Sequence, residues 1–226
     1  MKHGIMCLTL ALGALFAATA QAVTYTWTQV ADGAASAGSQ QALNLYANSS
    51  VTYAASITYG AAVGSGTLLS IGKGSNSCLF SVGLDASGNY VLTTSTSGGT
   101  LTAGTTVAAA ADKRQTVALS CYRSSGTQMG TVVLSVDGVV VATLTSATIT
   151  SGPIKWAEWG RKVGNADAYT GSAEYDAWFT QGDGQDYLLD AATIQKEVDG
   201  LLIPEPTALA LLALGAAALA LRRRAA

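Results

Sequence analysis

Short runs of alternating apolar and polar residues fill most of the chain and constrain its fold more than any other feature. Successive side chains of a β-strand point to opposite faces, so a period of two is typical of strands packed on a core by one face. Asp137-Gly138 separates two such runs and is a strong signal for a two-residue hairpin. The pattern predicts strands at 50–59, 67–71, 78–84, 90–95, 115–122, 131–136, 139–144, 154–159 and 173–180, with a hairpin loop at 85–89 and mostly loop at 98–110.

Helical periodicity occurs only near the end of this body. Ile194, Val198 and Leu201 follow one another at helical spacing and predict an apolar stripe that packs on the sheets. Asp190 precedes them, and its carboxylate can accept the unpaired N–H groups of a first helical turn. Many short strands followed by one late helix predict an all-β fold, an antiparallel two-sheet sandwich with one short C-terminal helix.

The N-terminus has the layout of a secretory signal peptide. Lys2 and His3 form a basic head, residues 5–18 are apolar, and Ala20-Gln21-Ala22 offers small residues at both Ala20 and Ala22 for cleavage. The expected signal peptide is therefore 1–22, and the mature chain begins at Val23. The alternative is an N-terminal anchor that is not cleaved.

The C-terminus carries a second targeting pattern. Pro204, Glu205 and Pro206 precede an apolar span, 207–221, and then Arg222, Arg223 and Arg224. The span is shorter than the ~20 residues of a full membrane helix, and the arginines favour a cytoplasmic location for that end. Read without any family, this is a single-span anchor.

The same three features in this order resemble the PEP-CTERM sorting signal. That resemblance implies a transient membrane helix, cut near Pro-Glu-Pro by an exosortase-type protease. It also implies export through the inner membrane of a Gram-negative bacterium to the cell surface or extracellular matrix. The expected organisation is a signal peptide (1–22), one domain (23–203) and a sorting segment (204–226).

Composition excludes several functional classes. The terminal segments hold four of the 12 Lys and Arg and one of the 14 Asp and Glu, which leaves the domain with 8 against 13 and a formal charge of −5. An acidic domain without a basic patch argues against nucleic acid as a partner. The single histidine, His3, lies in the signal peptide. Ser-His-Asp and Cys-His catalysis and imidazole-based metal sites are therefore excluded from the domain.

Four segments resemble LamG-like, concanavalin A-like jelly rolls. They are Thr67-Leu68-Leu69-Ser70-Ile71-Gly72, the hairpin 134–141, the strand 171–179 and the helical turn 190–198, in the family's order over roughly 50–201. The resemblance implies a jelly-roll sandwich of the kind that hosts lectins, adhesion modules and glycoside hydrolases. Lys113-Arg114-Gln115 stands where the family usually has a Trp-His pair, so this chain diverges there.

A hydrolase of this type needs three carboxylates on one strand face, in an E-x-D-x-(x)-E pattern. Glu174 and Asp176 fit the first two places, but the third falls at Trp178 or Phe179. Without that residue the strand offers no general acid to protonate the leaving oxygen. We therefore expect no glycosidase activity, and a divergent glycoside hydrolase remains the least favoured interpretation.

Carbohydrate binding is the favoured interpretation. Sugar rings stack on exposed aromatic faces and their hydroxyls bind carboxylates, which makes Trp156, Trp159, Asp176 and Trp178 the candidate ligand residues. The alternative is that these tryptophans belong to the core, as most strand tryptophans do. Calcium is common in related modules, but no calcium loop is readable here, and no metal or cofactor is predicted.

Cys78 and Cys121 are the only cysteines of the domain. An oxidising compartment favours a disulfide between them. If the strand at 90–95 lies between theirs, their Cα atoms are about 9.6 Å apart, two spacings of ~4.8 Å, which is beyond the ~7 Å reach of a disulfide. Both alternatives, a bridge and two buried thiols, remain open.

The sequence as a whole predicts an exported, surface-sorted, non-catalytic binding module. Its expected partners are the sorting protease and a polysaccharide, either exopolysaccharide or host glycan, or a surface protein. A protein-interaction or structural component of the matrix without a sugar site is the alternative. Exposed aromatic residues on a concave sheet would favour the first interpretation, and a face of Thr, Ser and Ala would favour the second.

Overall fold

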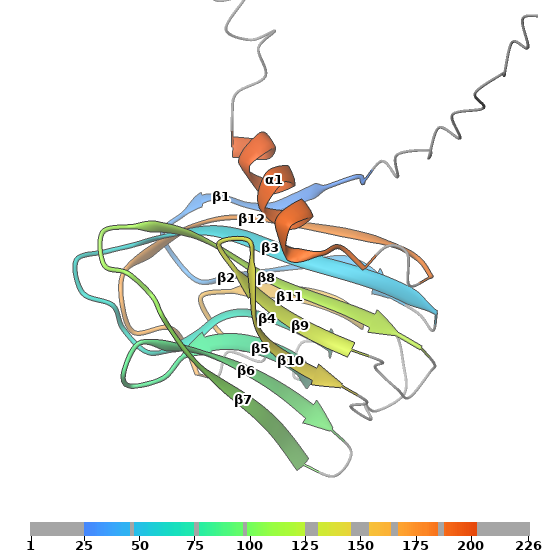
Figure 1. Cartoon of the computed structure of the whole chain (residues 1–226), viewed down its shortest axis with the longest axis horizontal. Coiled ribbons are helices and arrows are strands. Elements are labelled where there is room, and N and C mark those ends of the chain that lie inside the picture. Colours follow the sequence, from blue (N-terminus) through green and yellow to red (C-terminus); the bar gives the residue numbers. More distant parts are fainter. Residues whose placement is uncertain are drawn as a thin grey trace, which may run out of the picture.

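The computed structural model is a sandwich of two six-stranded antiparallel sheets with one helix on its outside (Figure 1). Sheet I has the strand order β1-β12-β3-β8-β9-β10, and sheet II the order β2-β11-β4-β5-β6-β7. The predicted all-β, two-sheet architecture with one short C-terminal helix is confirmed. The structure describes residues 25–45, 48–74, 77–96, 99–124, 131–145, 154–163, 167–184 and 188–202.

All nine predicted strands are present, and three more accompany them. The strands are β1 (Thr28–Ala34), β2 (Gly38–Leu45), β3 (Ser49–Tyr59), β4 (Gly66–Gly74), β5 (Ser77–Leu84), β6 (Asn89–Thr96), β7 (Gly99–Ala108), β8 (Arg114–Arg123), β9 (Thr131–Val136), β10 (Val139–Thr145), β11 (Ile154–Trp159) and β12 (Ala173–Asp183).

The prediction of a loop at 98–110 was wrong. Thr100, Leu101 and Thr102 of β7 pair in register with Ser95, Thr94 and Thr93 of β6. Threonine is a good strand former, but the stretch lacks the apolar alternation that marks a strand with one buried face. An edge strand needs only one hydrogen-bonded neighbour, so pairing with β6 defines it. β1 and β2 were also missed, and they pair with β12 and β11.

The core lies between the two sheets and follows the predicted alternation. In β3, the odd-numbered residues Val51, Tyr53, Ala55, Ile57 and Tyr59 point inward and are fully buried. Each large apolar side chain removed from water in this way contributes about 1.5–3 kcal/mol. The facing layer from sheet II includes Leu69, Ile71, Phe80, Val82 and Leu92.

A buried polar chain joins the two sheets through this core. The Tyr59 and Tyr90 hydroxyls lie 2.9 Å apart, and the Tyr90 hydroxyl donates to Gln115 Oε1 at 3.1 Å. Gln115 Nε2 in turn donates to Asp137 Oδ2 at 3.0 Å. Desolvation raises the pKa of both tyrosines, so they stay protonated. Asp137 sits in the predicted hairpin turn with φ +49° and accepts the Thr116 N–H at 2.8 Å.

The helix α1 (Ala191–Leu202) covers part of the outer face of sheet I (Figure 1). Asp190 caps it as predicted, because its Oδ1 accepts the Thr193 N–H at 2.9 Å, and that hydrogen bond lowers the pKa of Asp190. Ile194 and Val198 are buried against the sheet, whereas the third predicted stripe residue, Leu201, is 40% exposed. In the last turn Leu202, not Leu201, packs on the cluster beneath α1.

The two cysteines lie in opposite sheets, Cys78 in β5 and Cys121 in β8. The arrangement with one strand between them, which the distance estimate assumed, is not present, because β6 pairs with β5 and β7 while β8 belongs to sheet I. Both are free thiols. Burial raises the pKa of the Cys78 thiol to about 11 and that of Cys121 further, so neither forms an appreciable thiolate at neutral pH.

Two free thiols per molecule are the expected result of a thiol titration on denatured, unreduced residues 23–203. The reason is that both thiols are free: Cys121 belongs to the core between the sheets, whereas Cys78 is only half-buried and donates to the Phe80 carbonyl. A reduced sample serves as the control and should give the same value. A reading of zero thiols without reductant would contradict this placement.

The predicted targeting residues at both ends, including Ala20, Ala22, Pro206 and Arg222 to Arg224, lie outside the described residues. Within the described part of the chain, no helix is long and apolar enough to cross a membrane.

Candidate functional site

A row of polar side chains crosses the outer face of sheet II from one edge to the other. Directly paired residues share a face of a sheet, so the register of the six strands aligns their side chains. From β2 to β7 the row reads Ser39, Glu158, Ser70, Ser81, Thr93 and Thr102. Short hydroxyl side chains make most of this surface, and they can each donate and accept hydrogen bonds.

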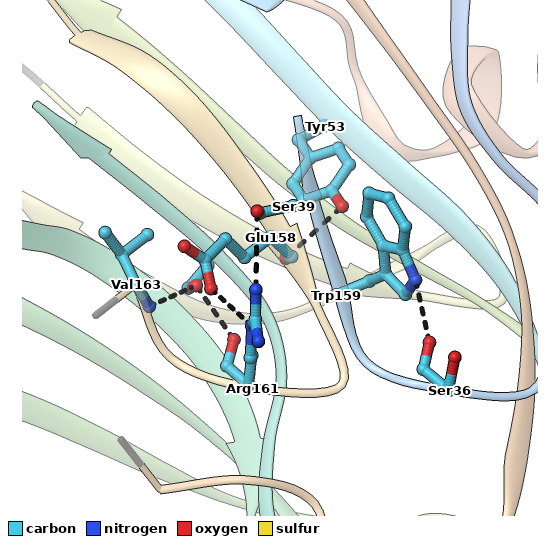
Figure 2. Close-up of polar contacts among 8 residues, drawn as sticks. Ser36, Ser39, Tyr53, Glu158, Trp159, Arg161 and Val163 are labelled. Carbon is cyan, nitrogen blue, oxygen red and sulfur yellow. Dashed lines mark hydrogen bonds and ion pairs between the residues drawn. The ribbon is translucent and has the colours of Figure 1, made fainter. Parts of the chain in front are cut away.

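The segment after β11 is fixed over the first half of this row (Figure 2). The Arg161 guanidinium donates to Glu158 Oε2 at 2.8 Å and to Ser39 Oγ at 3.3 Å. Ser70 Oγ accepts the Val163 N–H at 2.9 Å and donates to the Arg161 carbonyl at 3.0 Å. Val163 is buried as a result. The second half of the row, from Ser81 onward, lies beyond this segment.

We call the described residues after β11, 160–163 and 167–169, the wall. Asp167 connects the wall to the start of β4. Thr67 Oγ1 donates to Asp167 Oδ2 at 2.9 Å, and the Thr67 N–H donates to the Asp167 carbonyl at 3.0 Å. Asp167 has φ +50°, a left-handed conformation that Asp tolerates better than most residues. Gly66 also has a positive φ, +109°, and a Cβ there would come within 2.4 Å of the Ala168 carbonyl oxygen. The close approach of β4 to this wall therefore needs glycine.

A pocket of about 330 Å³ lies where the wall meets the open half of the row. Its volume falls at the small end of the range for ligand sites, ~300–1,000 Å³. The floor comes from β5 and β6, and the sides from the start of β4, the wall and the β5–β6 hairpin. The lining residues are Ser65, Gly66, Thr67, Ser81, Gly83, Leu84, Asp85, Ala86, Val91, Thr93, Lys162 and Asp167.

The hairpin side of the pocket is organised by Asp85. Its Oδ1 accepts the Ser87 N–H at 2.8 Å and the Asn89 N–H at 2.9 Å, which confirms the predicted hairpin loop. The Asn89 N–H hydrogen bond is the main cause that lowers the pKa of Asp85. Asp85 is therefore a carboxylate at neutral pH, and it can accept hydrogen bonds from a ligand but cannot donate them. With Lys162 and Asp167 it places both signs of charge at the rim.

The four predicted ligand residues do not come together. Trp159 is buried between the sheets, where its Nε1 donates to the Ser36 carbonyl at 3.1 Å (Figure 2). Trp178 is buried beneath α1. Trp156 is half-buried on the outer face of sheet II, paired with Gly72, and does not line the pocket. Trp159 and Trp178 are therefore core residues, which was the alternative to their role in ligand binding.

Asp176 lies on the opposite side of the molecule, on the outer face of sheet I. It shares that face with Glu174, as the period of two predicts, but it is engaged by the protein itself. Its Oδ1 accepts the Gly33 N–H at 2.7 Å, and its Oδ2 pairs with Arg114 at 3.0 Å. Arg114 also donates to Ser56 Oγ. With the arginine side chain 47% exposed, the ion pair contributes about 0–1 kcal/mol.

Neither the aromatic residues nor the carboxylate pattern of the sequence points to this pocket. None of the described residues that line it is aromatic. Its floor is made of Ser, Thr, Gly and Val. The sequence of these strands has the alternation of any strand with one buried face, so it does not mark a binding site. Within the described residues, no group of three or more His, Cys, Asp or Glu could hold a metal ion.

Comparison with known proteins adds a sorting motif and a fold. Residues 202–224 match the PEP-CTERM protein-sorting motif, in agreement with the predicted sorting segment. No curated protein matches the chain.

Among solved structures, the chain is similar to the CBM40 domain of the Ruminococcus gnavus IT-sialidase, solved with α2,3-sialyllactose. The TM-score is 0.50 at 14% identity, over 76% of this chain and 97% of that domain. It is also similar to Trypanosoma rangeli sialidase (TM-score 0.46, 17% identity, 66% of this chain) and to the binding domain of botulinum neurotoxin serotype D/C (0.44, 14%, 69%). The chain spans only 22% of that sialidase and 37% of that toxin domain. At these identities the likeness is one of fold.

Proposed function

We propose that the chain is exported, sorted to the cell surface or extracellular matrix of a Gram-negative bacterium, and binds carbohydrate there without catalysing a reaction. The pocket on sheet II is the proposed binding site. The observation that carries this proposal is a pocket of ligand size whose floor presents Ser81 and Thr93 hydroxyls and whose rim presents Lys162, Asp85 and Asp167.

Sugars offer many hydroxyls that both donate and accept hydrogen bonds. Serine and threonine hydroxyls do the same, carboxylates accept, and an ammonium donates, so this lining can satisfy a sugar ring on several sides. Gly83 leaves part of the floor as bare backbone. The fold supports the same ligand class, because the similar Ruminococcus gnavus domain was solved with a sialylated sugar.

Three features support the non-catalytic part of the proposal. The domain contains no histidine. Asp85 is held as a carboxylate by its hydrogen bonds and cannot act as a general acid at neutral pH. Glu174 and Asp176 lie on the other sheet, with Asp176 bound to Arg114. The carboxylates that fit the hydrolase pattern, Glu174 and Asp176, are therefore not in this pocket.

The experiment is a glycan-array screen of residues 23–203, with and without calcium, followed by calorimetric titration of the strongest hit. Lys162→Ala should weaken that interaction about tenfold, the loss of one charge-assisted hydrogen bond of roughly 1.5 kcal/mol. Lys113→Ala removes the same charge from an exposed position outside the pocket and should leave binding unchanged. Equal effects of the two substitutions would place the site elsewhere.

A structural component of the matrix is the second candidate, and one observation favours it. The outer face of sheet II presents mainly Ser, Thr and Gly around the pocket, and the described part of the pocket lining contains no aromatic side chain. A stacking platform would normally add affinity for a sugar. The absence of any glycan binding in the screen, with or without calcium, would support this candidate against the first.

Processing at both ends is part of the proposal and has its own test. The secreted form should have the mass of a chain that begins at Val23 and lacks Arg222 to Arg224, because the sorting motif spans 202–224. Intact mass spectrometry of material from the culture surface measures this directly. A mass that retains the three arginines would make the C-terminal segment a lasting anchor.

A further inference from the structure

Exposed large apolar side chains gather on one flank of the sandwich. Among the described residues, only five large hydrophobic side chains are exposed, and four of them lie on β7 and β10. Leu101 (45% exposed) and Val107 (36%) belong to β7, and Val139 (62%) and Val140 (51%) belong to β10. Because β7 and β10 contact each other, the four residues share this flank. Soluble proteins seldom leave such a concentration uncovered without a use for it.

The same flank carries the open edges of both sheets. β7 ends sheet II and β10 ends sheet I, and no other described strand pairs with their outer sides. Edge strands present unpaired N–H and C=O groups, and natural proteins usually protect them with charged residues or proline. Neither Gly99–Ala108 nor Val139–Thr145 contains a charged residue or a proline. β7 runs in regular register with β6 from Gly99 to Gly104, and its register shifts only beyond that point.

We propose that this flank is a self-association surface in which β7 of one molecule pairs antiparallel with β7 of a second copy. Two identical strands that run antiparallel are related by a twofold axis perpendicular to the sheet, so one contact completes a closed dimer. An uncharged strand suits this partner, because the symmetry would otherwise bring like charges together. Leu101 and Val139 of each copy would then be shielded from water by the partner's flank.

The expected dimer is weak. A regular pairing of six residues with a few apolar neighbours falls at the small end of protein interfaces, below the ~1,200–2,000 Å² of stable complexes. We therefore expect dissociation constants on the order of tens of micromolar for the isolated domain. The local concentration of molecules held on a surface or in a matrix would exceed that dissociation constant, so dimers would form there.

Pairing through β7 would also join the two copies of sheet II into one continuous sheet. The perpendicular twofold axis keeps the outer faces of both copies on the same side, so the two pockets would open in the same direction. For a polymeric ligand this arrangement allows bivalent binding, which raises the apparent affinity well above that of one site. This consequence rests on the proposed sugar site, whereas the dimer itself does not.

The test is sedimentation velocity of residues 23–203, which contain every described element, from about 1 to 500 µM. The wild-type domain should shift from monomer to dimer over this range. The double variant Leu101→Lys/Val107→Lys should stay monomeric, because the twofold axis would bring the lysines of the two copies onto one strand pair, where like charges repel. Leu201→Lys replaces a comparably exposed leucine on α1 and should dimerise like the wild type. A wild-type domain that stays monomeric throughout, or a double variant that dimerises normally, overturns the proposal.

Cross-linking supplies a readout that does not depend on the charge variants folding well. Thr102 of β7 is exposed and lies near the middle of the paired segment 99–104, and a Cβ at Gly200 on α1 would meet no atom within 4 Å. An antiparallel strand faces its own copy only at the twofold axis, so Thr102→Cys should give a covalent dimer under mild oxidation, since the paired Cα atoms there fall within disulfide reach. Gly200→Cys should not. Cross-linking at Gly200 alone would contradict the β7 interface while leaving the sugar-binding proposal untouched.

Discussion

Replacing Trp178 by alanine is expected to lower the free energy of unfolding by about 3–5 kcal/mol, the usual cost of removing a large buried aromatic side chain. Trp178 is 4% exposed and fills the space between sheet I and α1, together with Ala54, Ala118, Ile194 and Val198. The two alanines are too short to close the gap that the substitution leaves. The helix would lose the largest side chain of the cluster that it packs on, and denaturant unfolding monitored by circular dichroism would measure the change.

Trp156→Ala is the matched control for that substitution. Trp156 is half-buried on the outer face of sheet II, with glycine as its partner on β4. Less apolar area is exposed by its removal, so the expected cost is about 1–2 kcal/mol. Equal losses for the two tryptophans would mean that α1 does not rest on Trp178 as the structure has it.

Thr93→Trp is expected to weaken glycan binding by about a hundredfold, equivalent to roughly 2.8 kcal/mol. Thr93 lies in the pocket floor between Ser81 on β5 and Thr102 on β7. An indole at this position would occupy part of the pocket volume of about 330 Å³ and exclude the ligand from it. Calorimetric titration with the glycan identified by the array would measure the loss.

Thr102→Trp adds the same bulk one strand further along the row. Thr102 is exposed and does not line the pocket, so this variant should bind within about threefold of the wild type. Unfolding curves of both variants separate a blocked pocket from a damaged fold. A Thr93→Trp variant that folds and binds normally would show that the pocket is not the glycan-binding site.

Local chemistry made parts of this fold predictable. The Asp137-Gly138 turn, the Asp190 cap and the alternation in β3 each depend on residues close together in the sequence, and each was confirmed. Alternation also predicted that Glu174, Asp176 and Trp178 share a face. It could not reveal that α1 covers that face at Trp178 and leaves it open at Asp176.

Other features depend on contacts between distant segments. β7 was missed because its sequence, rich in Thr, Ala and Gly, does not alternate apolar and polar residues. Its pairing with β6 is what defines it as a strand. The cysteines were misplaced because the chain passes from sheet II to sheet I between β7 and β8. The pocket was missed because Thr67, Ser81, Thr93 and Asp167 meet only through strand register and the fastened segment after β11.

The most direct test of a sugar site on sheet II is a residue-resolved map of ligand contact. Amide chemical shifts of ¹⁵N-labelled residues 23–203 should be recorded while the glycan from the array is titrated. We expect shifts to concentrate at Ser81, Gly83, Val91, Thr93 and Lys162, and the outer face of sheet I around Asp176 and Arg114 should remain unchanged. Shifts centred on Asp176 and Arg114, or no shifts at saturating glycan, would contradict a sugar-binding site on sheet II.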